Sequence, residues 1–393
     1  MLSAEHRAIV TATVPILEQG GEALTRHFYQ TLFTDFPQVK PFFNQAHQHS
    51  GEQQRALANG ILMYAKHIER LEALGPLVNT IVTKHVALQI LPEHYPMVGA
   101  SLLKAIREVL GAETATDAVL EAWGAAYGQL AEILIGAEGK TYQAAAAAPG
   151  GWMGARQFVV AAKRVESDEI TSFVFRPVDG QPVLGFTPGQ YIGIRVVVDG
   201  QEQRRQYSLS AAPNGQTYQI SVKREEGGKV SGFLHANLDE GDTVDLFPPT
   251  GAFTLAQGSR PIVLISGGVG ITPTLAMLDQ ALETGREIRF IHAARHGGVH
   301  AFRDHVDGLA ERHPQLKRHY IYAEDRAGDV QADAVGLLGN KELGEWLPQS
   351  RDVDAYFLGP VPFMQAVKRS LRELGVPEAQ TYFEFFGPAK ALD

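Results

Sequence analysis

The stretch from Pro76 to Pro96 contains His85, a side chain able to bind a metal or move a proton. Apolar residues recur there at helical spacing, Pro76 suits a helix start, and Pro92 predicts an end near Leu91. An imidazole on such a helix is either a core histidine with one hydrogen-bond partner or a ligand to a group held against the helix. Taken alone, the core histidine is the default, so the choice depends on the rest of the chain.

A second candidate site is the segment Ser266–Pro273, SGGVGITP, which follows an apolar run typical of a buried strand and precedes a predicted helix. Glycines at such a turn let the backbone approach a pyrophosphate, and a helix N-terminus offers N–H groups and the positive end of the helix dipole. The spacing differs from G-x-G-x-x-G, which argues against an ordinary Rossmann dehydrogenase. The segment predicts nucleotide binding, with an ordinary strand–helix turn as the alternative.

Length and composition restrict the classes of protein that the chain can represent. A length of 393 residues predicts two or three domains, and 45% hydrophobic with 20% charged residues is typical of a soluble globular protein. The net charge of −9 disfavours nucleic acid or an anionic membrane as the main partner. Without cysteine, disulfides and thiolate chemistry are excluded, so a metal must be held by histidine or carboxylate, or arrive inside a cofactor. We find neither a signal peptide nor a membrane-spanning run, and expect a cytoplasmic protein.

The elements that must position His85 are helices, since the chain up to about Tyr142 shows helical periodicity and hardly any strand pattern. Ser3 is expected to cap the first helix, and Gly20-Gly21 to break it. Further helices are expected over residues 21–36, 59–71, 76–91, 97–110 and 116–135. An alanine run after Thr141 is expected to prolong the last helix, and Pro149-Gly150-Gly151 to mark a hinge.

Beyond Trp152 the apolar period changes to two, which predicts strands. Short β-rich runs separated by turn dipeptides cover residues 158–165, 170–177, 189–198, 217–224 and 243–251. The final part alternates strands at 261–268, 288–295, 318–325, 354–360 and 381–386 with helices at 275–285, 301–313 and 363–375. We therefore expect a multidomain protein: an all-α domain at 1–143, an antiparallel β-barrel at 152–258, and an α/β domain with a doubly wound parallel sheet at 259–393.

Residues 152–393 resemble the ferredoxin–NADP reductase family through a small set of motifs. These are Arg205-Gln206-Tyr207-Ser208 at the end of a barrel strand, Gly359-Pro360 after a later strand, and Glu384-Phe385-Phe386-Gly387-Pro388 near the end. The resemblance implies that Arg205 neutralises the FAD pyrophosphate, Tyr207 stacks on the isoalloxazine ring, and Ser208 bonds near its reactive nitrogen.

The same resemblance implies further contacts to both nucleotides. Tyr191, in PGQY, is similar to another flavin contact, and Gly228 and Ser231 to a second pyrophosphate loop; barrel core and a hairpin turn are the alternatives. The implied nicotinamide-nucleotide contacts are Gly268, Val269, Gly270, Ile271, Thr272, Pro273, Gly359 and Pro360. Leu358 stands where the family often has a cysteine. Arg295 and His296 follow the second strand, where a 2′-phosphate could be received, but a solvated loop is equally plausible and the choice between NADH and NADPH stays open.

The whole chain resembles the flavohaemoglobins, in which a globin precedes such a reductase. The resemblance implies that His85 is the proximal haem ligand, that Tyr95 and Glu138 hydrogen-bond its imidazole, and that Tyr29 and Gln53 occupy the distal side. It also implies that Phe43 packs on the haem face, and that Lys84 and Glu384 act between haem and flavin. Each residue alone has an ordinary alternative, as core aromatic, solvated charge or helix surface.

The resemblance implies haem b, FAD and NADH or NADPH as cofactors, and nitric oxide dioxygenase activity. Electrons from NAD(P)H would pass through FAD to oxygen at the haem, and nitric oxide would be converted to nitrate. We expect a monomer with oxygen and nitric oxide as substrates, no nucleic-acid partner and no membrane span; a lipid in the distal pocket is left open. The alternatives are an NAD(P)H-driven haem peroxidase or alkylhydroperoxide reductase, and an oxygen sensor or storage globin with its own reductase.

Overall fold

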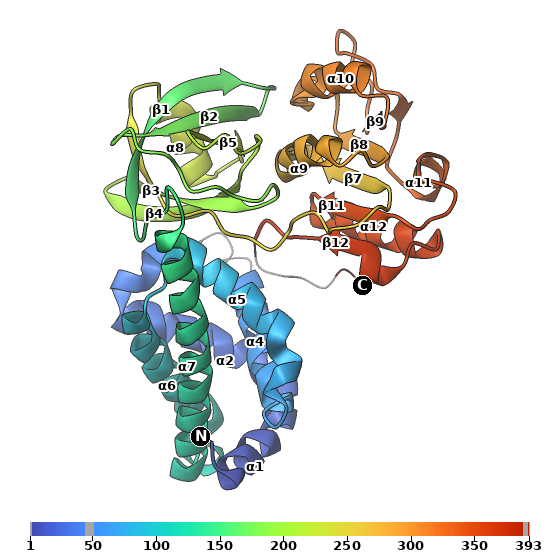
Figure 1. Cartoon of the computed structure of the whole chain (residues 1–393). Helices are drawn as coiled ribbons and strands as arrows, with labels where there is room; N and C mark the ends of the chain where they lie inside the picture. The colour runs from blue at the N-terminus through green and yellow to red at the C-terminus, as the bar shows by residue number, and fades with distance from the viewer. Residues whose placement is uncertain (1, 44–50, 388–391, 393) are drawn as a thin grey trace. The chain divides into compact units, whose positions relative to one another are not determined.

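The computed structural model describes residues 2–43, 51–387 and 392. The chain forms two compact units, one built mainly from residues up to Ala147 and the other mainly from the residues after it (Figure 1). Within the described residues, no helix combines the length and the apolar character that a membrane crossing requires.

The first unit is helical, which confirms the all-α expectation. Its α-helices are α1 (Ala4–Ala12), α2 (Val14–Asp35), α4 (Glu52–Lys66), α5 (Gly75–Leu88), α6 (Tyr95–Thr114) and α7 (Asp117–Ala147), with short 3-10 turns at Pro37–Phe42, Leu71–Leu74 and Pro92–His94. Ser3 caps α1 as expected, because its hydroxyl accepts the His6 backbone N–H at 3.0 Å. The alanine run does prolong α7.

The expected helix break at Gly20-Gly21 is wrong, because α2 continues through both glycines. A glycine inside a helix costs about 1 kcal/mol relative to alanine, which tertiary packing can offset. Here a Cβ on Gly21 would lie 3.5 Å from the Ala58 Cβ of α4, an ordinary van der Waals distance, so this face of α2 packs on α4. The break occurs instead at Thr13, whose hydroxyl donates to the Val10 carbonyl at 2.6 Å, just before the proline in the first turn of α2.

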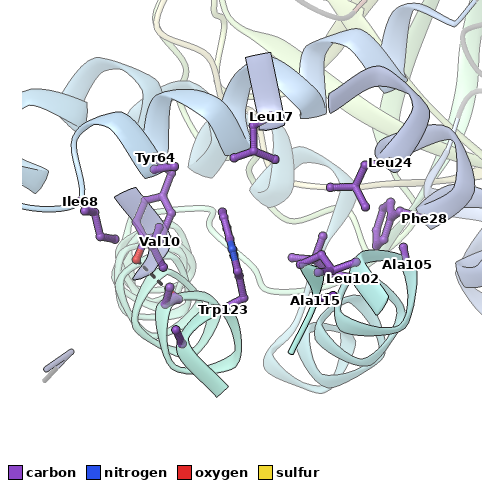
Figure 2. Close-up of a cluster of buried hydrophobic side chains, with 14 of the residues drawn as sticks. Val10, Leu17, Leu24, Phe28, Tyr64, Ile68, Leu102, Ala105, Ala115 and Trp123 are labelled. Atoms are coloured by element: carbon purple, nitrogen blue, oxygen red, sulfur yellow. Dashed lines mark hydrogen bonds between the residues drawn. The ribbon is translucent and has the colours of Figure 1, made fainter. Parts of the chain in front are cut away.

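The core of the helical unit forms around Trp123, which is buried among side chains from several helices. Figure 2 shows its indole between residues of α1, α2 and α6, including Val10, Leu17 and Leu102. Tyr64 lies in the same cluster, where its hydroxyl donates to the Ala126 carbonyl at 2.8 Å. Burial raises the pKa of Tyr64 to about 12. This bond ties α4 to α7 at the centre of the unit.

The second unit begins with a curled antiparallel sheet. Its strands are β1 (Arg156–Val165), β2 (Ile170–Pro177), β3 (Tyr191–Val198), β4 (Gln201–Ser208), β5 (Tyr218–Lys223) and β6 (Thr243–Leu246), in the order β4-β3-β6-β1-β2-β5. A bridge between Leu209 and Ile220 joins the two edges of the sheet, as a barrel requires. Strand β4 ends at Ser208, as expected for the Arg205–Ser208 motif, whereas helix α8 (Lys229–Asn237) was not predicted.

A parallel sheet follows in the same unit, with strand order β10-β9-β8-β7-β11-β12. The strands are β7 (Ile262–Gly267), β8 (Ile288–Ala294), β9 (Leu316–Tyr322), β10 (Ala334–Val335), β11 (Asp354–Leu358) and β12 (Thr381–Phe383), and the helices are α9 (Ile271–Glu283), α10 (Arg303–Arg312), α11 (Asn340–Trp346) and α12 (Val361–Glu373). In β7, Leu264 packs into one core while Val263 and Ile265 pack into the core on the other face. Burial on both faces explains the wholly apolar strand and confirms the doubly wound sheet.

Candidate functional site

His85 lies near the C-terminus of α5, within hydrogen-bonding distance of two side chains from other helices. Its Nδ1 atom is 2.7 Å from Glu138 Oε1 on α7 and 3.2 Å from the Tyr95 hydroxyl on α6. The Tyr95 hydroxyl donates to the same carboxylate oxygen at 2.7 Å. Burial, and then this bond to Glu138, raises the pKa of Tyr95, so the phenol stays protonated as a donor. The structure therefore brings together the three residues that the sequence placed in one site.

Two tyrosines that the sequence analysis did not single out support this group. Tyr127 donates to the Tyr95 backbone carbonyl at 2.6 Å, and Tyr142 donates to the Ile90 carbonyl at 2.8 Å, just after α5. Both lie on α7, on the same side as Glu138, at spacings close to whole helical turns. The sequence signal that could have identified them is the row of tyrosines with one glutamate along this predicted helix.

Tyr29 and Phe43 lie against each other elsewhere in the helical unit. Their ring centroids are 5.6 Å apart in an edge-to-face arrangement, and Tyr29 is buried on α2. Gln53 lies half-buried in the first turn of α4, beside Gln54, whose carbonyl accepts a bond from Thr25 of α2 at 2.9 Å. This contact anchors the start of α4 against the helix that carries Tyr29.

The residues of the helical unit fit a haem. Nδ1 of His85 makes the hydrogen bonds described above, which would leave Nε2 to hold a haem iron, and 32% of the side chain is accessible. The carboxylate that fixes this tautomer is 2% exposed, so the arrangement is rigidly built. Lys84, the neighbour of His85, is half-buried on α5.

The flavin motifs lie next to each other in the barrel. The Leu209 N–H donates to the Gln190 carbonyl at 3.0 Å, which places the end of β4 with Tyr207 and Ser208 beside the start of β3 with Tyr191. Ser208 and Tyr191 are buried, whereas Tyr207 is half-buried and packs on the barrel core. Burial, and then the Glu384 carboxylate, raises the pKa of Tyr191, which keeps it neutral.

The polar residues of β4 are held within the strand. Arg205 donates to the Arg204 carbonyl at 2.7 Å and to the Gln203 side-chain oxygen at 3.2 Å. Gln206 follows as a half-buried residue of the same strand. This edge of the barrel therefore presents a fixed cation close to the aromatic ring of Tyr207 in sequence, which fits a flat, anionic nucleotide.

Gly228 forms the N-terminus of α8 rather than the hairpin turn that was its alternative. A Cβ there would lie 2.4 Å from Ser231 Oγ and 3.0 Å from the Glu225 backbone oxygen, so only glycine fits. The Ser231 hydroxyl accepts the Glu225 N–H at 3.2 Å and thereby shapes the loop. A tight loop that leads into a helix N-terminus fits a pyrophosphate.

Glycines also line the junction between β7 and β11, where the strand order of the parallel sheet reverses. A Cβ on Gly270 would lie 2.2 Å from the Leu358 carbonyl oxygen, and one on Gly359 would lie 2.7 Å from the Phe363 ring. Gly268 has a φ of +54°, and the Thr272 hydroxyl donates to the Val269 carbonyl at 3.0 Å. Such a switch point is where doubly wound sheets bind nucleotides.

The remaining expected contacts of this sheet lie around the same carboxyl edge. Ile271 and Pro273 are buried in the first turn of α9, and Pro360 is exposed before α12. The expected strand 381–386 ends at Phe383; beyond it Phe385 packs on the sheet core and Phe386 is largely exposed. Gly387 has a φ of +136°, and Pro388 lies outside the described residues.

Three family models match successive parts of the chain: Globin at residues 26–134, Oxidoreductase FAD-binding domain at 157–255, and Oxidoreductase NAD-binding domain at 264–369. Among curated proteins, the flavohemoprotein of Burkholderia sp. (strain TH2) is 66% identical over 393 residues, which is 100% of both chains. The flavohemoprotein of Pseudomonas aeruginosa is 63% identical over the same length.

Solved structures agree with these matches. A flavohemoglobin from Malassezia yamatoensis, with bound FAD and heme, has a TM-score of 0.86 at 26% identity and covers 98% of this chain and 100% of its own. The flavohem-like FAD/NAD-binding domain of nitric oxide dioxygenase from Vibrio cholerae has a TM-score of 0.55 at 40% identity and covers 59% of this chain and 99% of its own. Haem, FAD and a nicotinamide nucleotide are thus the cofactors of an NAD(P)H oxidoreductase, and the chain belongs to the flavohemoprotein family.

Proposed function

We propose that the chain is a nitric oxide dioxygenase that converts nitric oxide to nitrate with oxygen and NAD(P)H, in the cytoplasm where that reductant is available. The observation that carries the proposal is the buried Glu138 carboxylate, 2.7 Å from Nδ1 of His85. A globin that only stores oxygen needs an imidazole ligand but has no evident use for a full anionic charge behind it. The similarity to a domain of a nitric oxide dioxygenase also supports the proposal.

When bound, the cofactors supply the redox chemistry: nicotinamide gives up two electrons as hydride, flavin releases them one at a time, and haem iron accepts single electrons. His85 would hold the iron through Nε2, while its Nδ1–H donates a hydrogen bond to the Glu138 carboxylate. The carboxylate gives the imidazole imidazolate character, which raises electron density at the ligand. Tyr95 donates to the same carboxylate oxygen at 2.7 Å and keeps it in line with His85.

On the opposite side, Tyr29 would supply a phenol from the buried face of α2, and Gln53 an amide from the start of α4. A phenol O–H aimed at substrate oxygen stabilises negative charge that develops there and slows oxygen loss. The edge-to-face contact between the rings of Tyr29 and Phe43 limits the movement of the phenol.

In the reductase, we assign the flavin to residues 152–258 and the nicotinamide nucleotide to residues 259–393, with the globin at 1–143. Arg205 and the N-terminus of α8 at Gly228 neutralise the FAD pyrophosphate, while Tyr207 and Ser208 hold the isoalloxazine. The backbone of residues 268–273 and 359–360 holds the nicotinamide nucleotide. Lys84 and Glu384 are assigned to the step between flavin and haem.

One assay tests the proposal. Purified holoprotein is mixed with NADH, oxygen and nitric oxide, and both nitrate and NADH are quantified over time. Nitrate that accumulates over many turnovers, coupled to NADH oxidation, supports the dioxygenase. A single turnover of nitrate would instead indicate oxygen storage or sensing, and faster NADH oxidation with an alkylhydroperoxide than with nitric oxide would indicate a peroxidase.

A further inference from the structure

The loops that follow β8 and β9 carry two arginines and a histidine at the carboxyl edge of the parallel sheet. Arg295 and His296 follow β8, and Arg326 follows β9. The two loops lie side by side, because the Glu324 N–H donates to the Arg295 carbonyl at 3.0 Å. In doubly wound sheets, the ribose of a dinucleotide is recognised at the end of the second strand, and an arginine there accommodates the 2′-phosphate of NADP. In the β7–β8–β9 part of this sheet, β8 is that strand.

Each of the two arginines is paired with a carboxylate, and His296 contacts a third carboxylate. Arg295 pairs with Glu169 at 2.5 Å, and His296 Nδ1 lies 3.1 Å from Asp329 Oδ2. Arg326 pairs with Glu324 at 2.5 Å. The positive charge that a 2′-phosphate requires is therefore already neutralised at this edge.

The Glu169 carboxylate is fixed in place by the turn between β1 and β2, which packs against the loop after β8. The Asp168 N–H donates to the Gly298 carbonyl at 3.0 Å, and a Cβ on Gly298 would lie 2.5 Å from Asp168 Oδ2. The Glu169 carbonyl accepts the Arg224 N–H at 2.7 Å. The Glu169 side chain is 18% exposed while that of Arg295 is 64% exposed, so the anchored partner is the carboxylate.

Asp329 holds the other side of the same loop. Its carboxylate accepts the Gly298 N–H at 2.9 Å in addition to its contact with His296. The backbone bond from Gly298 is the main reason why the pKa of Asp329 is lowered, so the group is anionic at neutral pH. A Cβ on Gly297 would lie 2.7 Å from the Val330 carbonyl oxygen, which shows how closely the two segments pack.

We propose that the Glu169–Arg295 pair makes the nucleotide site selective for NADH over NADPH. Glu169 neutralises Arg295 at the ribose end of the site, Glu324 neutralises Arg326, and the anionic Asp329 adds negative charge that repels a 2′-phosphate. Glu169 acts as a positioning residue, through Arg295. The inference rests on the nucleotide-binding half of the proposed function and deepens it by naming the reductant.

The first test measures binding rather than turnover. Isothermal titration of the holoprotein with 5′-AMP and with adenosine 2′,5′-bisphosphate compares two probes that differ only in the 2′-phosphate. We expect 5′-AMP to bind about tenfold more tightly, which is the effect of one unfavourable or missing charge-assisted contact. Equal or tighter binding of the 2′,5′-bisphosphate overturns the proposal.

Variants then test the pair itself. Glu169→Gln leaves Arg295 unneutralised and should tighten binding of the 2′,5′-bisphosphate about tenfold, a gain that Glu169→Gln/Arg295→Ala should lose. Glu287→Gln is the matched control, because Glu287 pairs with Arg289 at 2.5 Å at the opposite end of β8. A Glu169→Gln affinity no different from that of Glu287→Gln overturns the role of Glu169.

If Glu169→Gln fails to retain FAD, the single variant Arg295→Ala provides a second test. We expect Arg295→Ala to bind the 2′,5′-bisphosphate as weakly as the unmodified protein does; a marked loss would show that Arg295 already receives the 2′-phosphate and would overturn the proposal. Anaerobic flavin reduction by NADH and by NADPH, followed by stopped flow, gives the same comparison with intact cofactors. These measurements use neither oxygen nor nitric oxide, so they do not depend on dioxygenase activity. If the proposed function alone were wrong, flavin reduction would still be selective for NADH, but the nitric oxide assay would yield no nitrate.

Discussion

The Nδ1 atom of His85 lies 2.7 Å from Glu138 Oε1, although the two residues are 53 positions apart in the chain. The second carboxylate oxygen, Oε2, is buried and has no hydrogen-bond partner among the described residues. The hydrogen bonds of the carboxylate thus converge on Oε1, which contacts the imidazole and accepts from the Tyr95 hydroxyl at 2.7 Å each. A buried carboxylate oxygen without a hydrogen-bond partner costs folding free energy. We therefore expect the charge of Glu138 to serve a function at this position.

Glu138→Gln should weaken the imidazolate character of His85, because a neutral amide is a poorer acceptor than a carboxylate. We expect a lower iron–histidine stretching frequency in resonance Raman spectra of the ferrous protein, and about a tenfold loss of nitric oxide consumption. Glu132→Gln, an exposed glutamate on the same helix, is the control. An unchanged frequency in Glu138→Gln would show that the contact does not act on the iron.

Tyr29→Phe should accelerate oxygen dissociation and sharply reduce nitric oxide consumption, because the hydroxyl that stabilises charge on the substrate oxygen is lost. Reduction of the flavin by NADH should stay intact. Tyr64→Phe removes another buried hydroxyl of the helical core, one that donates to Ala126, and should cost about 1 kcal/mol of stability without a change in oxygen dissociation. Equal oxygen dissociation rates in Tyr29→Phe and the unmodified protein would contradict the distal role.

His85→Ala should give a protein that retains FAD absorbance but lacks the ferrous haem Soret band, because the proposed axial ligand is lost. The measurement is an absorbance spectrum of purified protein, with flavin content as the internal reference. His94→Ala tests specificity. His94 lies in the 3-10 turn after α5, where its Nδ1 accepts the Leu91 N–H at 2.8 Å. A normal Soret band in His85→Ala would rule out ligation by this residue.

Asp354→Asn should destabilise the reductase unit, because Asp354 pairs with Arg286 and both side chains are buried. Removal of one partner of a buried ion pair costs about 3–5 kcal/mol, since the other charge is left unpaired. Arg286 also donates to the Ala256 carbonyl at 3.1 Å, so the pair fixes the segment between barrel and sheet. Thermal release of FAD, followed by flavin fluorescence, measures the effect, and Asp352→Asn at an exposed partner of Arg260 should shift it little.

The parallel sheet should lose stability in mild acid through two buried histidines. Their ring centroids are 4.4 Å apart; His292 contacts Ser266 Oγ at 2.8 Å and His300 contacts the Tyr322 hydroxyl at 2.7 Å. Burial lowers the pKa of His292 from 6.5 to about 3. Burial is also the main cause of the lowered pKa of His300, with His292 next. Both are therefore neutral in the folded protein at neutral pH.

Because the folded pKa values are lowered, the unfolded chain binds protons first as the pH falls. The stabilisation is complete above about pH 6.5 and declines below it by about 1.4 kcal/mol per pH unit for each histidine. Thermal unfolding between pH 5 and 8 should show this slope, and His292→Asn should flatten it while His305→Asn, at an exposed position, should not. Identical slopes in all three proteins would contradict the assignment.

Local periodicity determined the class and order of the domains. The apolar period near 3.6 up to Tyr142, the period of two beyond Trp152, and the alternation after residue 259 each reflect which faces of an element are buried, and that information is carried by neighbouring residues. The Ser3 cap and the glycine loop after β7 are local for the same reason. The roles of His85 and the Arg205–Ser208 segment came from the resemblance to known families, which rests on local motifs.

Tertiary structure alone decided which side chains meet and where local signals are overridden. Helix α2 continues through Gly20-Gly21, where Gly21 faces Ala58 of α4, a contact that no helix propensity describes. Arg295 is neutralised by Glu169, 126 positions away, so a cation that suggested a phosphate site in the sequence already has its counterion in the structure. Charge pairing and close packing depend on distances in space, and these are set only when the chain has folded.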